Sequence, residues 1–287
     1  MTERRQTRSK TVEALQHALL ALVICVVSIA AVSFFGPLNR AEQWLHDFRL
    51  AYLAPLVEQS ADVVVLAIDE ETLRLMPYRS PLDRSFLARL VESLTNLHRI
   101  RAIGIDVIFD QPTVPDADEQ LRSAILRAEV PVIVATGEEQ AGMTKQQLDF
   151  QDTYLDGIGK GSAVLSVESS AVRTYYPYAP TSGRSSFVHS IATAADIAAP
   201  SEPLPILFRR AASDNASPVR VFPAQSVDIL PPEWLEDRIV LIGAVLSDRD
   251  QHRTPLSIIG GEHEFMAGVL IHAQVLAQLT AGVRLQP

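Results

Sequence analysis

An uninterrupted apolar segment near the N-terminus constrains the fold of this chain more than any other feature. From Ala18 to Phe35 the sequence reads ALLALVICVVSIAAVSFF, with Ser28 and Ser33 as its only polar residues. As an α-helix, this segment would extend over roughly 27 Å, which is close to the thickness of the hydrocarbon core of a bilayer. The sequence therefore predicts a transmembrane helix from Ala18 to Leu38.

The charges beside the apolar segment predict its orientation. Basic residues precede it at Arg4, Arg5, Arg8 and Lys10. Because positive charge is retained on the cytoplasmic side, we expect residues 1–17 to form a cytoplasmic tail. Residues 39–287 would then form a periplasmic domain anchored in the inner membrane. The alternatives are a signal peptide cleaved near Ala30 and Ala31, and a buried core helix. The length of the apolar run and its lack of a polar face favour the retained anchor.

Composition limits what the domain can bind. The net charge is −9, and the first ten residues carry four basic side chains against Glu3, so about −12 remains on the rest of the chain. An acidic domain is a poor partner for nucleic acid. Cys25 is the only cysteine, and it lies in the apolar segment. The sequence therefore predicts no internal disulfide, thiol nucleophile or zinc–thiolate site in the domain.

Buried strands and amphipathic helices alternate along the rest of the chain. Four short apolar runs rich in β-branched residues read as buried strands, at residues 63–68, 103–109, 131–135 and 238–245. Helical patterns accompany them at residues 81–97, 118–128 and 266–280. This alternation is typical of parallel strands joined by helical crossovers. We therefore expect one α/β domain over residues 39–287, with a mostly parallel sheet flanked by helices.

Other segments have weaker patterns. Residues 40–58 have an amphipathic helical pattern, residues 186–199 read as a helix of small apolar residues, and residues 219–222 read as a short strand. Strand-like pieces on either side of Ser169 and Ser170 predict a hairpin. Residues 138–160 are polar, and we expect them to be irregular and exposed.

Polar side chains gather where the predicted strands end. Because ligands bind at the carboxyl edge of open α/β sheets, these residues are candidates for a ligand site. The candidates are Asp69, Asp106, Asp110, Asp248, Asp250, His252 and Thr254. Within this set, Asp248, Asp250 and His252 offer the oxygen and imidazole groups that a divalent cation accepts, so a divalent cation is the one cofactor considered.

A structural role is the alternative for the same residues. An aspartate at a strand end also caps the following helix, and it pairs with arginines such as Arg49, Arg84, Arg249 and Arg253. The sequence has no Gly-rich phosphate loop, nucleophile elbow or HExxH motif, so no catalytic residue is predicted. His272, in GVLIHAQ on the last helix, fits a semi-buried structural histidine better than a ligand.

Several segments together resemble the CHASE type 2 domain. The longest are WLHDFRL (44–50), VVVLAIDEETL (63–73), AIGIDVIFDQP (102–112), RIVLIGAVLSDRDQHRTPL (238–256) and GVLIHAQVLAQL (268–279). They occur in the family's order and extend over nearly everything after the apolar segment. The positions that match its most distinctive motifs are Asp47, Arg49, Asp69, Glu70, Asp106, Asp110, Asp248, His252, Thr254, Pro255 and His272.

The resemblance implies an extracytoplasmic sensory domain of a membrane-bound receptor, whose output is a cyclase, a kinase or a diguanylate cyclase. The expected partners are a small-molecule or ion ligand, the membrane and a cytoplasmic effector. A homodimer packed through residues 40–58 and 266–280 would supply the two conformations that a signal requires. The sequence stops at Pro287 without an effector, so we expect the output elsewhere and no enzyme activity here. A membrane-anchored metal-dependent hydrolase and a non-enzymatic interaction scaffold are the alternatives.

Overall fold

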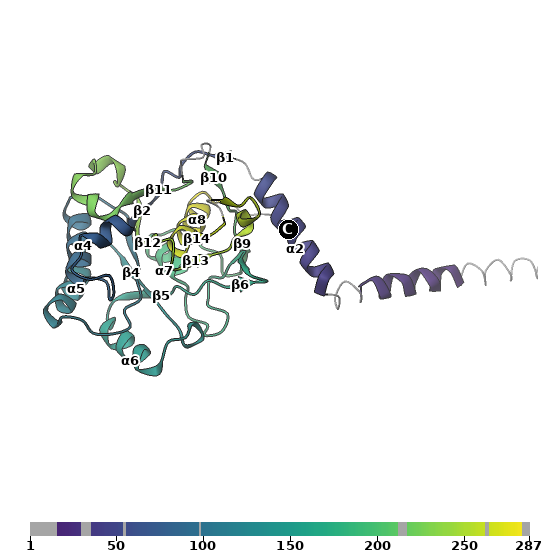
Figure 1. The fold of residues 1–287 in the computed structure, drawn as a ribbon, viewed down its shortest axis with the longest axis horizontal. Helices are drawn as coiled ribbons and strands as arrows, with labels where there is room; N and C mark the ends of the chain where they lie inside the picture. Colours follow the sequence, from purple (N-terminus) through teal and green to yellow (C-terminus); the bar gives the residue numbers. More distant parts are fainter. Residues whose placement is uncertain are drawn as a thin grey trace, which may run out of the picture. The chain divides into compact units, whose positions relative to one another are not determined.

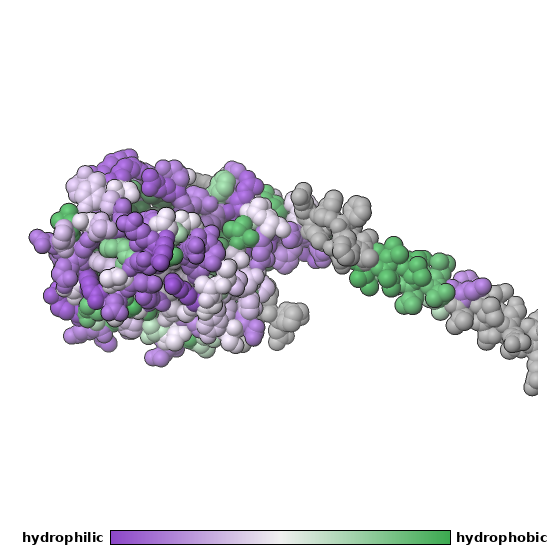
Figure 2. Space-filling model, turned by 90° about the horizontal axis from the view of Figure 1, so that it is seen from below, coloured by the Kyte–Doolittle hydropathy of each residue, from purple (hydrophilic) through white to green (hydrophobic). Residues whose placement is uncertain are grey.

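A computed structural model of the chain describes residues 16–29, 36–53, 56–97, 99–211, 217–261 and 264–282. The chain divides into two compact units, with the boundary after Arg49. In the first unit, residues 16–29 are helical and their large apolar side chains are exposed. These residues are the green stretch of Figure 2. Helix α2 (Gly36–Leu53) begins in the first unit and ends in the second.

The predicted transmembrane helix lies only partly within this description. Residues 30–35 of the span from Ala18 to Leu38, and most of the basic tail at residues 1–17, fall outside the described residues. Among the helices that are described, none combines the length and the apolar character needed to cross a membrane. The membrane anchor therefore remains a prediction from the sequence.

A six-stranded, fully parallel sheet forms the centre of the second unit, as the alternating pattern predicts (Figure 1). Its order is β11 (Arg220–Pro223), β2 (Val63–Ile68), β12 (Ile239–Ala244), β3 (Ala102–Asp106), β4 (Val132–Thr136) and β5 (Gly159–Ser162). The late strand β12 lies between the two early strands β2 and β3. This insertion brings the loop after β12 to the carboxyl end of β3.

Helices cover both faces of the sheet. Helices α4 (Arg84–Leu97) and α5 (Pro115–Arg127) cover one face, and α7 (Phe187–Ala194) and α8 (Gly268–Thr280) cover the other (Figure 1). Strand β2 is buried on both sides, because Val63 and Val65 pack in the α7/α8 core while Val64 and Leu66 pack in the α4/α5 core. Burial of each such side chain stabilises the fold by roughly 1.5–3 kcal/mol. Because successive side chains of the strand point into opposite cores, every position is apolar, and the sequence shows a continuous apolar run.

Shorter elements complete the second unit. They are α3 (Glu70–Arg74), α6 (Lys145–Tyr154) and the 3₁₀ helices η1 (Glu139–Ala141), η2 (Ala224–Ile229), η3 (Pro232–Trp234) and η4 (Pro255–Ile258). Four two-stranded pairs join β1 (Leu56–Val57) to β10 (Arg210–Ala211), β6 (Val167–Glu168) to β7 (Ala171–Val172), β8 (Thr174–Tyr175) to β9 (Leu204–Pro205), and β13 (Gln251–His252) to β14 (Met266–Ala267). The β6–β7 hairpin turns at Ser169 and Ser170, as predicted, and both residues have positive φ.

The expectation that residues 138–160 are irregular and exposed is wrong. They contain helix α6 and lead into the edge strand β5. A capping box starts the helix, because the Thr144 side chain and the Gln147 side chain each bond the other's backbone. The helix is mostly polar, and β5 reads GKGS. Neither element therefore has the apolar periodicity that predicts a helix or a strand from sequence.

Gly161 lets strand β5 lie directly against the start of α7. A Cβ atom at this position would stand 2.7 Å from the Cα of Phe187 and 2.8 Å from the backbone oxygen of Ser186. Because both atoms belong to the backbone, neither moves aside cheaply. We expect Gly161→Ala to lower the free energy of unfolding by about 1–3 kcal/mol, the usual cost of overpacking, in urea denaturation. Lys160→Ala on the same strand removes only a surface ion pair with Asp152 and should cost about 1 kcal/mol or less. Equal effects of the two substitutions would contradict this packing.

Candidate functional site

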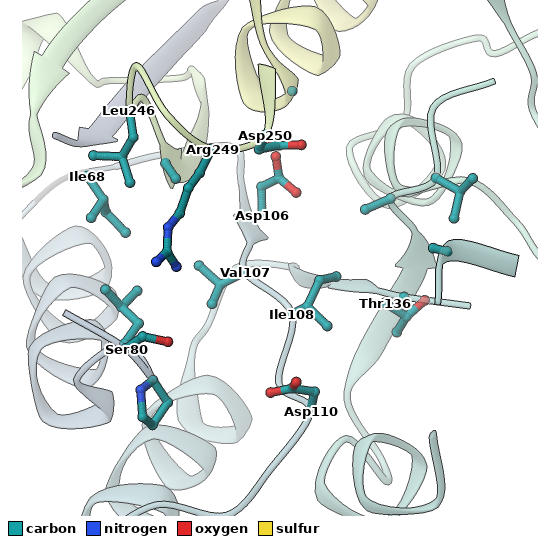
Figure 3. Close-up of a pocket in the computed structure, with 18 of the residues that line it drawn as sticks. Ile68, Ser80, Asp106, Val107, Ile108, Asp110, Thr136, Leu246, Arg249 and Asp250 are labelled. Carbon is teal, nitrogen blue, oxygen red and sulfur yellow. The ribbon is translucent and has the colours of Figure 1, made fainter. Parts of the chain in front are cut away.

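A pocket of about 740 Å³ opens at the carboxyl edge of the sheet (Figure 3). The last residues of four parallel strands line it, namely Ile68 of β2, Asp106 of β3, Thr136 of β4 and Ala244 of β12. The volume lies within the range of small-molecule sites, and the wall combines apolar side chains with a few ionisable ones. The pocket therefore occupies the edge at which the sequence predicts a ligand site.

The segment after β12 carries Asp250 and His252 to this edge. Strand β13 pairs with β14, so that His252 lies opposite Met266. Asp250 precedes β13 in a left-handed conformation with φ of 50°, which aspartate tolerates better than most residues. Its backbone oxygen accepts a hydrogen bond from the amide of Gly268 at 3.0 Å. This bond ties the pocket loop to the first residue of α8.

Because Gly268 has no Cβ atom, the Asp250 carboxylate can lie directly against its backbone. A Cβ atom at Gly268 would overlap Oδ2 of Asp250. The carboxylate consequently lies beside the N-terminal end of α8, where the helix dipole stabilises negative charge. Nε2 of His252 lies 2.9 Å from Oδ1 of Asp250 on the other side. The carboxylate of Asp250 is therefore held between the start of α8 and the ring of His252.

Asp106 is in a different electrostatic environment from Asp250. Its side chain faces that of Asp250 at the end of β3 (Figure 3). Burial raises the pKa of Asp106 to about 8, and the charge of Asp250 adds to the rise. At neutral pH Asp106 is therefore mainly in its neutral, protonated form. Asp106 thus offers a proton donor to the pocket beside the side chain of Asp250.

His272 forms the back of the pocket one turn along α8 from Gly268. It is buried, and its ring packs edge-on against Phe187 with 5.3 Å between ring centroids. Burial lowers the pKa of His272 to about 4, although Asp250 and a hydrogen bond to the backbone of Ala163 oppose this change. His272 is therefore a neutral side chain at physiological pH, in agreement with its interpretation as a structural histidine.

Arg84 closes the opposite side of the pocket from the start of α4. Its side chain is only 1% exposed, and its guanidinium lies 4.2 Å from the ring centroid of Phe109. Nε donates to Asp118 at 3.4 Å, and Nη2 donates to the backbone oxygen of Gln111 at 3.4 Å. Burial lowers the pKa of Arg84, but the ion pair and the aromatic face keep the cation stable inside the domain.

The structure brings together four of the seven sequence candidates. Asp106, Asp110, Asp250 and His252 line the pocket. Asp110 also accepts a hydrogen bond from Nε2 of Gln147 at 2.7 Å, and Gln147 lies in the segment for which the sequence predicted no helix.

The other three candidates lie outside the pocket wall. Asp69 caps α3 by accepting from the amide of Thr72 at 2.7 Å, and Thr254 caps η4 by accepting from the amide of Leu256 at 3.2 Å. Asp248 is exposed. The capping role is the structural alternative that the sequence left open for the aspartates.

The remaining positions that match the family motifs lie outside the pocket wall. Glu70 forms a two-bond ion pair with Arg79, at 2.8 and 2.9 Å. Pro255 is the first residue of η4 and is buried. Asp47 and Arg49 belong to the first unit, on α2.

A metal centre finds no support in the placement of these side chains. Within the described ranges, no group of three or more histidine, cysteine, aspartate and glutamate side chains is arranged to hold a metal ion. Asp250 and His252 bond each other, and Asp248 does not line the pocket.

Sequence reasoning missed several pocket residues. The sequence suggests Arg249 only as an ion-pair partner of the aspartates and gives no indication of Arg79 or Thr136. All three residues line the pocket. Figure 3 shows the Arg249 side chain extending into the cavity. The sequence does contain an indication that Arg249 belongs to the site, because it lies between the candidates Asp248 and Asp250 in the polar stretch after the last strand.

These features define an α/β domain with a small-molecule type of pocket at the carboxyl edge of a parallel sheet. The profile of the CHASE2 domain matches residues 20–287, so the chain belongs to the CHASE2 domain family. CHASE2 domains are sensory modules of signalling receptors. Comparisons with curated proteins and with solved structures find no match.

Proposed function

We propose that this chain is the extracytoplasmic ligand-sensing part of a membrane-bound signalling receptor, and that the pocket at the carboxyl edge holds the ligand. The observation that carries this proposal is the convergence of Asp106, Asp250 and His252 on one cavity of about 740 Å³. A site that only stabilised the fold would not need an open cavity of this size. The predicted anchor at Ala18–Leu38 would place the domain outside the cytoplasm.

The contact between the pocket loop and α8 offers a route for the signal. A ligand that binds the Asp250 side chain acts on a residue whose backbone bonds Gly268, the first residue of α8. A conformational response requires only that the ligand binds one arrangement of this contact better than the other. The receptor output, a cyclase, kinase or diguanylate cyclase, belongs to this proposal as the partner of the domain.

Of the two segments that the sequence suggests for a homodimer interface, residues 40–58 and 266–280, only the first remains suitable. Residues 268–279 of α8, except Leu270, are buried inside the second unit. The helix at 266–280 therefore has no free face for a second copy, because the sheet and α7 already cover it. Helix α2 keeps Trp44, Leu45 and Leu53 exposed and remains available for this role.

A thermal-shift screen of the full chain in mild detergent, with divalent ions and periplasmic metabolites, tests the ligand-binding function. We expect at least one compound to raise the melting temperature of the wild-type protein. Asp250→Ala should abolish that shift, because it removes from the pocket wall the carboxyl group that faces Asp106. Asp156→Ala, at an exposed position away from the pocket, should retain it.

Two results would contradict the proposed site. A shift that survives Asp250→Ala but disappears with Asp248→Ala would locate the ligand outside the pocket wall. A screen in which nothing stabilises the wild-type protein would count against ligand sensing itself.

A further inference from the structure

One carboxyl group and one guanidinium in the pocket wall have no protein partner. Within the part of the chain that the structure describes, the side chains of Asp106 and Arg249 form neither a hydrogen bond nor an ion pair. The other charged groups of the wall are already bonded by protein groups: Arg79 by Glu70, Arg84 by Asp118, Asp110 by Gln147 and Asp250 by His252. A carboxyl group and a guanidinium are therefore left to interact with the contents of the pocket.

The two groups occupy separate parts of the pocket. Asp106 extends from β3 toward Asp250, whereas the guanidinium of Arg249 projects into the cavity away from both carboxyl groups (Figure 3). The apolar side chains of Ile68, Val107 and Leu246 also line this cavity. The pocket thus has an acidic end, a basic end and an apolar wall.

The charges of the wall select among ligand classes. A ligand with two cationic groups would bring a positive charge to Arg249, and a ligand with two anionic groups would bring a negative charge to Asp250. Either contact is repulsive, and the repulsion is strengthened by the reduced dielectric of a pocket. A lone ion would satisfy one end and leave most of the 740 Å³ cavity without contacts.

We infer that the pocket binds a zwitterionic small molecule, with a cationic amino group between Asp106 and Asp250, a carboxylate on Arg249, and an apolar body along Ile68, Val107 and Leu246. This inference rests on the proposed function and specifies the chemistry of its ligand. A guanidinium is the side chain best suited to a carboxylate, because it donates two parallel hydrogen bonds. Amino acids and short apolar peptides carry this combination of groups.

Calorimetric titration of the full chain in mild detergent tests the inference. The probes are the free amino acids and the dipeptide Ala-Leu, each with its N-acetylated and C-amidated forms, together with putrescine and succinate. We expect a zwitterion to bind. Blocking either of its charges should weaken binding by about 10- to 100-fold, as expected for the loss of a charged hydrogen bond.

Two variants assign each charge to its end of the pocket. Arg249→Gln should weaken binding of the zwitterion to a similar extent, yet leave the affinity of its C-amidated form unchanged. Asp250→Asn, which removes the carboxylate that faces Asp106, should likewise make binding insensitive to N-acetylation. Arg99→Gln and Asp152→Asn, at exposed positions outside the pocket wall, should behave as wild type. Arg249 is exposed and unpaired, so its substitution should leave the melting temperature of the unliganded protein unchanged.

The outcomes separate this inference from the proposed function. Preferred binding of putrescine or succinate would overturn the zwitterion and leave ligand sensing intact. Undiminished binding of the zwitterion by Arg249→Gln would overturn the assignment of its carboxylate. If neither these probes nor the metabolites of the thermal-shift screen bind, the proposed function and the inference fail together.

Discussion

Asp118→Ala should lower the free energy of unfolding by about 3–5 kcal/mol, the typical cost of removing one partner from a buried ion pair. Asp118 accepts from Nε of Arg84 at 3.4 Å, and also from the amide and the hydroxyl of Thr113 at 2.8 and 2.7 Å. Its loss leaves the buried Arg84 guanidinium without its hydrogen-bonded carboxylate, with only the more weakly interacting Asp110 to offset its charge. Denaturation in urea, followed by circular dichroism, measures the effect.

Asp116→Ala is the matched control for this substitution. Asp116 lies in the same first turn of α5, but it is exposed and does not line the pocket. Both aspartates interact with the helix dipole, which is worth about 0.3–1 kcal/mol, so the difference between the two variants isolates the buried ion pair. Equal effects of the two substitutions would mean that the Arg84–Asp118 contact contributes little. Because Arg84 lines the pocket, a large difference would also identify the pair as part of the pocket's framework.

A second large effect is expected in the pH dependence of stability. Burial raises the pKa of Asp106 from 3.8 to about 8, so the folded protein keeps a proton that the unfolded chain has already lost. Rising pH therefore favours unfolding between about pH 4 and pH 8. Burial lowers the pKa of His272 from 6.5 to about 4, and here rising pH favours folding between about pH 4 and pH 6.5.

Between about pH 4 and pH 6.5 the effects of Asp106 and His272 on the free energy of unfolding have opposite signs and cancel. Above pH 6.5 only the effect of Asp106 remains. At about 1.4 kcal/mol per pH unit, the wild-type protein should lose about 2 kcal/mol of stability between pH 6.5 and pH 8. The other ionisable groups that line the pocket near the end of β3 include Asp250, His252, His272 and Arg249. Of these, Asp250 reinforces the shift directly.

Asp106→Asn should abolish this loss, because asparagine has no proton to release. Urea denaturation at several pH values from 6.5 to 8 should give a flat stability profile for Asp106→Asn and a falling one for wild type. Asp152→Asn, on the exposed side of α6, should keep the wild-type profile. The explanation would fail if the profile of Asp106→Asn fell as steeply as that of the unsubstituted protein.

Much of the fold follows from local patterns in the sequence. Strand β2 occupies residues 63–68 as predicted, because a six-residue run of apolar and mostly β-branched side chains is stable only when it is buried on both faces. Helix α4 begins at Arg84, three residues after the predicted start at Pro81, and α8 begins at Gly268 rather than at residue 266. Helix and strand ends are set by caps and neighbours, so such shifts are expected.

The elements that the sequence missed are stabilised by contacts rather than by composition. Helix α6 buries Gln151 and Tyr154 among mostly polar residues, and Gln151 bonds the backbone of Gly137 through both its oxygen and its nitrogen. Strand β5 is held by the backbone of β4 and by the close approach of α7 to Gly161. Hydrophobic periodicity carries no information about either contact.

The sequence by itself determined the parallel α/β architecture, the family and the edge of the sheet at which polar residues gather, because each of these depends on residues that are close in the chain. The apolar segment from Ala18 to Leu38 likewise predicts a membrane anchor from local composition alone. Only the tertiary structure decided which polar residues meet. Strand β12 inserts between β2 and β3, and this places Asp250 against Asp106 and Arg249 in the wall of the same pocket. Strand order depends on packing between distant segments, and no local pattern encodes it.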